Sequence, residues 1–153
     1  MIKGSCACGR IQYQSQAKPL AVNACHCGTC QLVSGAAFLA FAMVSVQELQ
    51  WTKQPDMWAR SDIAERGYCK VCGASVSMSY HFEPDRVWVT LGTVVFAEPP
   101  LPRPSVHIFL KEKAPWFVLP DDGAERRDEF SPEFAKFIET WKAEAKQPRR
   151  AKL

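Results

Sequence analysis

Three cysteines and one histidine occur within six residues, in the stretch CHCGTC at positions 25–30. Thiolate sulfur is a preferred ligand of Zn²⁺ and of other soft metal ions, and three sulfurs this close together can bind one ion. Three protein ligands leave one position of a tetrahedral zinc ion open, which is typical of reactive rather than structural sites. The stretch therefore indicates a metal centre that can bind an outside molecule.

The chain contains seven cysteines, an odd number that excludes a full set of internal disulfides. They form three groups: Cys6 and Cys8; Cys25, Cys27 and Cys30; Cys69 and Cys72. The first and last groups supply two sulfurs each, and together they would complete a closed, structural zinc site. The middle group then stands alone. Spacing leaves other groupings open, for example the first pair with two of the middle three.

The middle group predicts a simple local geometry. Cys25 and Cys27 are two residues apart, so on a strand their side chains would face the same side. A turn at Gly28 and Thr29 would then bring Cys30 to the same ion. We therefore expect three converging sulfurs with no distant ligand.

The three histidines are expected to serve as packing residues. On a strand His26 would point away from its cysteine neighbours, although ligation by His26 is the alternative. His81 and His107 lie in strand-like surroundings, where a satisfied, partly buried histidine is ordinary. A second interpretation of the whole pattern is that both cysteine groups are structural.

Three thiolates on a divalent zinc ion leave about one net negative charge, so the ion is less electrophilic than one bound by neutral histidines. Activation of water is therefore disfavoured. A fourth, outside thiol would be held deprotonated and electron-rich. The chemistry favoured by the sequence is the formation or cleavage of a bond between the sulfur of a small thiol and a carbonyl carbon.

The elements that must position these cysteines are mainly strands. Segments rich in Val, Phe, Tyr and Trp and bounded by Gly, Pro or Asp predict a mostly antiparallel β protein. These segments are residues 11–15, 36–45, 76–80, 86–95, 105–110 and 116–119. Residues 98–104, EPPLPRP, are expected to form an extended connection, because proline cannot donate to a ladder.

One helix is predicted near the end of the chain, at residues 132–146. Ser131 can cap it, Pro132 suits its first turn, and aromatic side chains such as Phe134 and Trp141 recur at helical spacing. We expect this aromatic face to pack on the sheet, with a homodimer or partner interface as the alternative. The domain prediction is one zinc-binding β domain at residues 1–147 and a basic tail at 148–153.

Composition limits the other function classes. The chain has 153 residues, 47% of them hydrophobic and 23% charged, and no apolar stretch long enough to cross a membrane. No signal-peptide core precedes the first cysteines, so we expect a cytoplasmic protein with reduced thiols. A net charge of +3 is only mildly basic, and nucleic acid is not an expected partner.

Five segments carry a family resemblance: GSCACG at 4–9, CHCGTC at 25–30, SGAAF at 34–38, ERGYCKVCG at 65–73 and HIFLKEKAPW at 107–116. With them the chain, over residues 4–120, resembles the glutathione-dependent formaldehyde-activating enzyme family, also called the centromere protein V family. The resemblance implies a β-tent fold of stacked antiparallel sheets. It also implies two zinc ions: a structural one on Cys6, Cys8, Cys69 and Cys72, and a catalytic one on Cys25, Cys27 and Cys30.

The activity implied by the resemblance is that of a carbon-sulfur lyase, in which formaldehyde and glutathione combine to S-hydroxymethylglutathione. Many relatives have an arginine after the last cysteine of the triad, where this chain has Gln31. Four cations could meet the carboxylates of a thiol substrate, and the sequence assigns none of them: Arg60, Arg66, Lys111 and Lys113. The alternative functions are a zinc-scaffolded binding module for protein or nucleic acid and a redox-responsive metal site.

Overall fold

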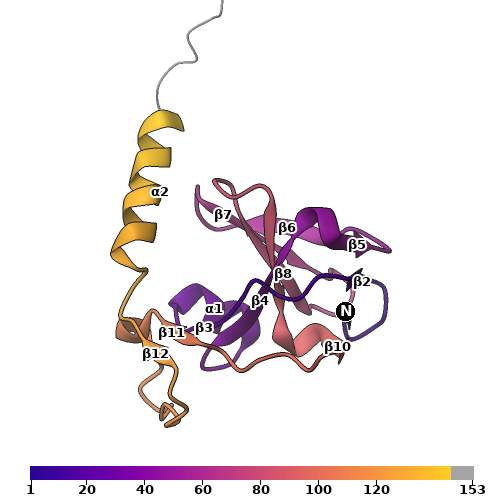
Figure 1. Cartoon of the computed structure of the whole chain (residues 1–153), viewed down its shortest axis with the longest axis horizontal. Helices are drawn as coiled ribbons and strands as arrows, with labels where there is room; N and C mark the ends of the chain where they lie inside the picture. The colour runs from indigo at the N-terminus through magenta and orange to yellow at the C-terminus, as the bar shows by residue number, and fades with distance from the viewer. Residues whose placement is uncertain (146–153) are drawn as a thin grey trace, which may run out of the picture.

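Two β-sheets form the body of the protein, and helix α2 leads away from them (Figure 1). A computed structural model describes residues 1–145. The smaller sheet has the order β10 (Val94–Ala97), β1 (Ile2–Ser5), β2 (Gln12–Ser15), β5 (Leu49–Trp51). The larger sheet has the order β12 (Glu125–Arg126), β11 (Val106–Ile108), β3 (Ala21–Cys25), β4 (Leu39–Ser45), β9 (Arg86–Thr90), β8 (Ser75–Tyr80), β7 (Ala64–Tyr68), β6 (Asp56–Ala59). The helical segments are α1 (Gly28–Ser34), α2 (Pro132–Ala145) and the short 3₁₀ turns η1 (Val46–Glu48), η2 (Leu91–Thr93) and η3 (Leu110–Glu112).

The prediction of a mainly β protein with a C-terminal helix is confirmed, with two corrections. Strand β11 pairs in parallel with β3 and β12, so the larger sheet is mixed rather than wholly antiparallel. The strand predicted at 116–119 is wrong, because these residues pair with no sheet. Trp116 and Val118 are 71% and 85% exposed, so their apolar character reflects neither a ladder nor a core position.

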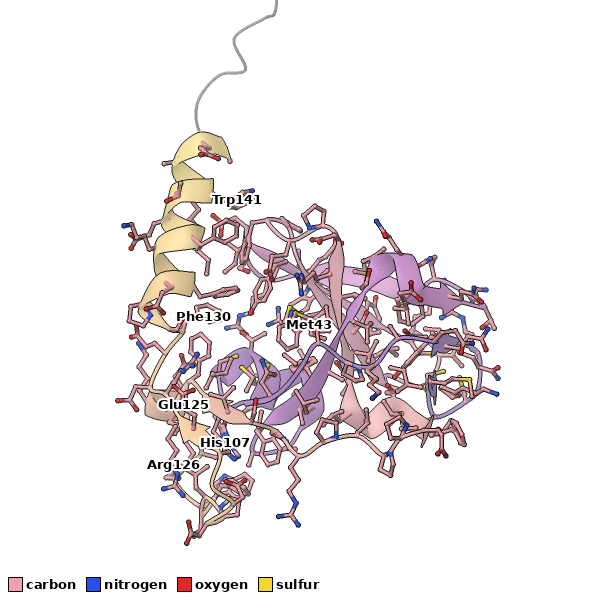
Figure 2. All side chains as sticks on the ribbon, in the orientation of Figure 1. Met43, His107, Glu125, Arg126, Phe130 and Trp141 are labelled. Atoms are coloured by element: carbon pink, nitrogen blue, oxygen red, sulfur yellow. The ribbon has the colours of Figure 1, made fainter. Side chains whose placement is uncertain are left out.

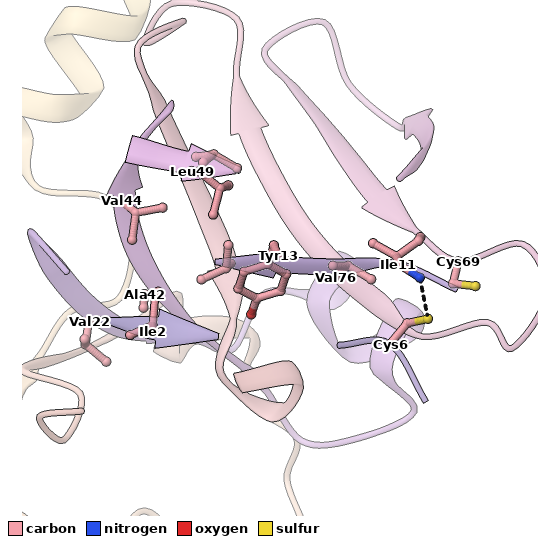
Figure 3. Close-up of a cluster of buried hydrophobic side chains, with 12 residues drawn as sticks. Ile2, Cys6, Ile11, Tyr13, Val22, Ala42, Val44, Leu49, Cys69 and Val76 are labelled. Carbon is pink, nitrogen blue, oxygen red and sulfur yellow. Dashed lines mark hydrogen bonds between the residues drawn. The ribbon is translucent and has the colours of Figure 1, made fainter. Parts of the chain in front are cut away.

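The two faces of the larger sheet carry different clusters of buried side chains. Along β4, Ala42 and Val44 face the cluster that packs between the two sheets, and Phe41 faces the opposite side. Figure 3 shows the inter-sheet cluster, which also includes Ile2 and Tyr13 of the smaller sheet. The opposite face carries the second cluster, which includes Cys25 and Cys30. The strand period of two therefore separates a structural face from the face of the candidate site.

A β-bulge lets strand β8 serve both faces. Gly67 pairs with Ser77 and Tyr68 pairs with Ser75, which leaves Val76 as the extra residue. Because of this irregularity Val76 belongs to the inter-sheet cluster, whereas Met78, two residues later, belongs to the site face.

Helix α2 begins and packs as predicted. The Ser131 hydroxyl accepts a hydrogen bond from the Phe134 backbone N–H at 3.2 Å, which caps the helix. The rings of Phe134, Phe137 and Trp141 lie 5.5 to 5.8 Å from that of Phe82, just beyond β8. Figure 2 shows Trp141 and Phe130 on the side of α2 that faces the sheets. The predicted basic tail at 148–153, and residue 146 of the predicted helix, lie outside the described residues.

Membrane crossing finds no support among the helices of residues 1–145, since none is both long and apolar enough to span a bilayer.

Candidate metal centres

The structure gathers four sulfurs from two distant segments. Those of Cys6, Cys8, Cys69 and Cys72 all lie within 4.8 Å of one another. The Cys6 and Cys8 sulfurs are 3.6 Å apart, and those of Cys8 and Cys69 are 3.7 Å apart. A tetrahedral zinc ion with Zn–S bonds of about 2.3 Å requires sulfurs about 3.8 Å apart. The donor set and its spacing therefore fit a closed zinc site.

Two tight loops hold this cluster at the edge of the inter-sheet core (Figure 3). The Cys6 sulfur accepts a hydrogen bond from the Ile11 backbone N–H at 3.3 Å. Gly9 and Gly73 close the two loops with φ near +75°, a left-handed conformation that other residues rarely adopt. The backbone itself, through this N–H···S hydrogen bond and the two glycine turns, therefore orients the sulfurs.

A charged group lies beside the same cluster. Arg10 donates to the Asp56 carboxylate at 2.6 Å and also lies 3.8 Å from the Cys69 sulfur. The hydrogen bond from Arg10, with one from the Lys70 backbone N–H, lowers the pKa of Asp56 to about 2. Four thiolates on a divalent ion would carry about two net negative charges, which the guanidinium partly offsets.

The other three cysteines also converge, but by a different local structure from the one predicted. The sulfurs of Cys25, Cys27 and Cys30 lie within 4.8 Å of one another. Cys25 ends β3, whereas Cys27 is the N-cap of α1 and Cys30 lies in its first turn. The prediction that Cys25 and Cys27 share a strand, with a turn at Gly28 and Thr29, is therefore wrong. The Cys27 sulfur accepts a hydrogen bond from the Cys30 backbone N–H at 3.4 Å, a capping role that serine usually performs.

These three sulfurs line a cavity of about 300 Å³. Within residues 1–145 no other Cys, His, Asp or Glu ligand atom joins their group. The cavity walls are mainly apolar and aromatic, and include Phe41, Ile63, Met78, Tyr80, Ile108 and Phe109. The three sulfurs fit three ligands of a soft metal ion, with the cavity beside them.

The ionisation of the sulfurs is unequal. Hydrogen bonds from Cys25 and Cys30 lower the pKa of Cys27, and the guanidinium of Arg66 acts in the same direction. The hydrogen bond to Cys27 raises the pKa of Cys25, as does burial. Burial, together with the nearby sulfurs, also raises the pKa of Tyr80 and keeps its hydroxyl protonated.

Side chains of α1 and η3 form hydrogen bonds with the backbone near Cys27. The Gln31 amide donates to the backbone carbonyls of His26 at 2.6 Å and Glu112 at 2.8 Å. The Glu112 carboxylate accepts a hydrogen bond from the Gly28 backbone N–H at 2.7 Å. Gln31 therefore connects α1 to η3.

The histidines do not join the sulfurs. His26 is fully buried, and its Nε2 lies 2.9 Å from Nδ1 of His107, whose Nε2 lies 3.0 Å from the Asp122 carboxylate. Burial, with the charges of His107 and Lys113, lowers the pKa of His26 to about 4. His107 lies beside β12 (Figure 2). The expectation of a partly buried, strand-like position is wrong for His81, which is exposed in the turn after β8 with its Nδ1 3.0 Å from the Asp62 carbonyl oxygen. His26 and His107 thus form a buried chain behind the cysteines, as packing residues should.

The structure separates the four candidate cations. Lys111 pairs with Glu129, Lys113 donates to backbone carbonyls, and Arg60 lies exposed on a loop. Arg66 alone of the four lines the cysteine cavity. Sequence reasoning missed Tyr80, which also lines it, because nothing in its local pattern distinguishes it from a core aromatic residue.

Comparison with known proteins supports a family assignment. Residues 1–112 match the family described as glutathione-dependent formaldehyde-activating enzyme. An uncharacterized lyase of Schizosaccharomyces pombe is 28% identical over 78 residues, which are 51% of this chain and 57% of that protein. The chain thus matches little more than half the length of that curated relative.

A solved structure of a Rhodobacter sphaeroides protein shares the fold. The two align with a TM-score of 0.51 at 18% identity, over 63% of this chain and 91% of that one. Since the matching family region includes all seven cysteines and covers most of the chain, the protein belongs to the glutathione-dependent formaldehyde-activating enzyme family.

Proposed function

We propose that this protein is a zinc-dependent carbon-sulfur lyase that joins and separates a small thiol and an aldehyde, as in the formation of S-hydroxymethylglutathione from glutathione and formaldehyde. The observation that carries the proposal is the triad of Cys25, Cys27 and Cys30, whose sulfurs converge on one side of a 300 Å³ cavity. Family membership supports the same reaction type. The four-cysteine cluster, by contrast, we assign to a structural zinc ion.

The proposed roles of the chain's own residues follow from this geometry. When bound, zinc supplies a Lewis-acid centre that lowers the pKa of a coordinated thiol. The three cysteines fix the position at which the substrate sulfur enters the cavity. The apolar walls exclude water from that sulfur, which strengthens its attack on carbon and suppresses side reactions.

The bond changes balance without an oxidant or reductant. The thiol proton leaves to water, the sulfur forms a bond with the aldehyde carbon, and the C=O π pair moves to oxygen. That oxygen then takes a proton from water, which gives a hydroxymethyl thioether. Tyr80 lines the same cavity, and its hydroxyl can donate a hydrogen bond to the oxygen as negative charge develops there.

Replacing Tyr80 by phenylalanine is therefore expected to lower the rate of adduct formation about 100- to 1,000-fold, the effect of removing one such donor. The ring contacts with Phe82, Phe130 and Phe134 remain, so the melting temperature should change little. Rates and zinc content of native and Tyr80→Phe protein decide the matter. An unchanged rate would remove Tyr80 from the mechanism.

The proposed function itself is tested with zinc-loaded protein, formaldehyde and a panel of small thiols that includes glutathione. Adduct formation is followed by NMR of the hydroxymethyl group, against the uncatalysed reaction. Acceleration with at least one thiol is the expected result. No acceleration with any thiol in either direction would refute the proposal.

A further inference from the structure

Arg66 is the positively charged side chain of the cysteine cavity. It lies on β7, where its backbone pairs with Trp58 of β6 and Met78 of β8. Its Nε is buried and has no hydrogen-bond partner, and no ion pair joins it to a carboxylate within residues 1–145. A guanidinium donates in five directions, and a buried donor without a partner costs free energy. The site therefore has unused capacity to bind an anion.

The remaining charges of the cavity are already in use. Apart from Arg66, Tyr80 and the three cysteines, Glu112 is the one ionisable residue on the described cavity walls. The Glu112 carboxylate accepts a hydrogen bond from the Gly28 backbone N–H, and its negative charge would repel the carboxylate of a bound ligand. The cavity thus offers, within residues 1–145, one positive charge without a carboxylate partner among mainly apolar side chains. Glutathione carries two carboxylates, and only one of them could be paired here.

We propose that Arg66 binds a carboxylate of the thiol substrate, and that this substrate is a compact thiol with a single carboxylate rather than glutathione. The inference rests on the proposed function, because it places the thiol sulfur at Cys25, Cys27 and Cys30. The planar guanidinium can bind a carboxylate through two parallel hydrogen bonds, so it fixes the distance between the anion and the reacting sulfur.

The experiment compares three probes by calorimetric binding to zinc-loaded protein: 3-mercaptopropionate, neutral 2-mercaptoethanol and glutathione. The native protein should bind 3-mercaptopropionate about 10- to 100-fold more tightly than 2-mercaptoethanol, as expected for a charge-assisted hydrogen bond. Glutathione should bind no more tightly than 3-mercaptopropionate. Arg66→Gln should abolish the preference for 3-mercaptopropionate over 2-mercaptoethanol, whereas Arg66→Lys should keep part of it. Arg60→Gln, which neutralises an exposed arginine outside the cavity, is the matched control and should behave as native.

The outcomes separate the two proposals. If no thiol binds the native protein, the proposed function fails and the role of Arg66 fails with it. If thiols bind but the charged and neutral ones bind equally, or glutathione binds best, only the inference about the substrate is overturned. It is also overturned if Arg66→Gln loses zinc from the three-cysteine site and weakens all three thiols alike, because Arg66 would then serve the metal cluster.

Discussion

Replacing Cys27 by serine is expected to lower the rate of thiol addition to formaldehyde at least about 100-fold, since even residues that only support metal ligands cost 10- to 100-fold. Cys27 is the most accessible sulfur of its cluster, because Cys25 and Cys30 are buried at 7% and 3% exposure. Serine is a preferred N-cap, and its hydroxyl can accept the hydrogen bond that the Cys27 sulfur takes from Cys30. Helix α1 should therefore persist while the metal site is lost.

The Cys27→Ser measurement combines turnover, zinc content and melting temperature. We expect one zinc ion per chain in place of two, with a melting temperature close to that of the native protein. Activity at the native level with one zinc ion lost would show that the triad does not carry the reaction.

Replacing Cys69 by serine should have the largest effect on stability. Cys69 is fully buried, and its cluster connects the loop after β1 to the loop after β7, more than 60 residues later. Zinc binding contributes about 10–16 kcal/mol to folding in small zinc-finger peptides, whereas whole domains are stable by only about 5–15 kcal/mol. Cys69→Ser protein should therefore be largely unfolded at room temperature or fail to accumulate in soluble form.

Val71→Ser provides a matched control for this prediction. Val71 lies in the same loop, is 67% exposed and supplies no ligand, so its replacement should leave zinc content and melting temperature unchanged. Circular dichroism and metal analysis of both variants distinguish the cases. A Cys69→Ser protein that melts within a few degrees of the native one would contradict a structural role for this cluster.

Much of the architecture was predictable because the relevant signals are local. Segments rich in Val, Phe, Tyr and Trp and bounded by Gly, Pro or Asp predicted strands β2, β4, β8, β9 and β11, and the cap at Ser131 predicted where α2 begins. The sulfurs form one group of four and one group of three, which is the simplest division of seven cysteines. Their roles as zinc ligands and as catalytic residues remain proposals.

The errors arose where a tertiary partner decides the outcome. The two-residue spacing of Cys25 and Cys27 predicts a shared strand, but the Cys27 sulfur instead accepts the capping hydrogen bond of α1. Residues 116–119 have strand-forming side chains but pair with no strand. The parallel pairing of β11 with β3 depends on a crossover that periodicity cannot show.

The cations illustrate the same limit at the site. Arg60, Arg66, Lys111 and Lys113 are equivalent as a sequence pattern. The pairing of β7 with its neighbours places Arg66 on the cavity wall. Lys111 instead forms an ion pair with Glu129.

X-ray absorption at the zinc edge, with and without a bound thiol, tests the central claim most directly. Seven cysteines shared by two ions give an average of 3.5 sulfur ligands per zinc, and a substrate thiol at the three-cysteine site should raise that average to 4. A sulfur count that stays the same when the thiol is added, at any concentration that supports turnover, would contradict an open position at Cys25, Cys27 and Cys30.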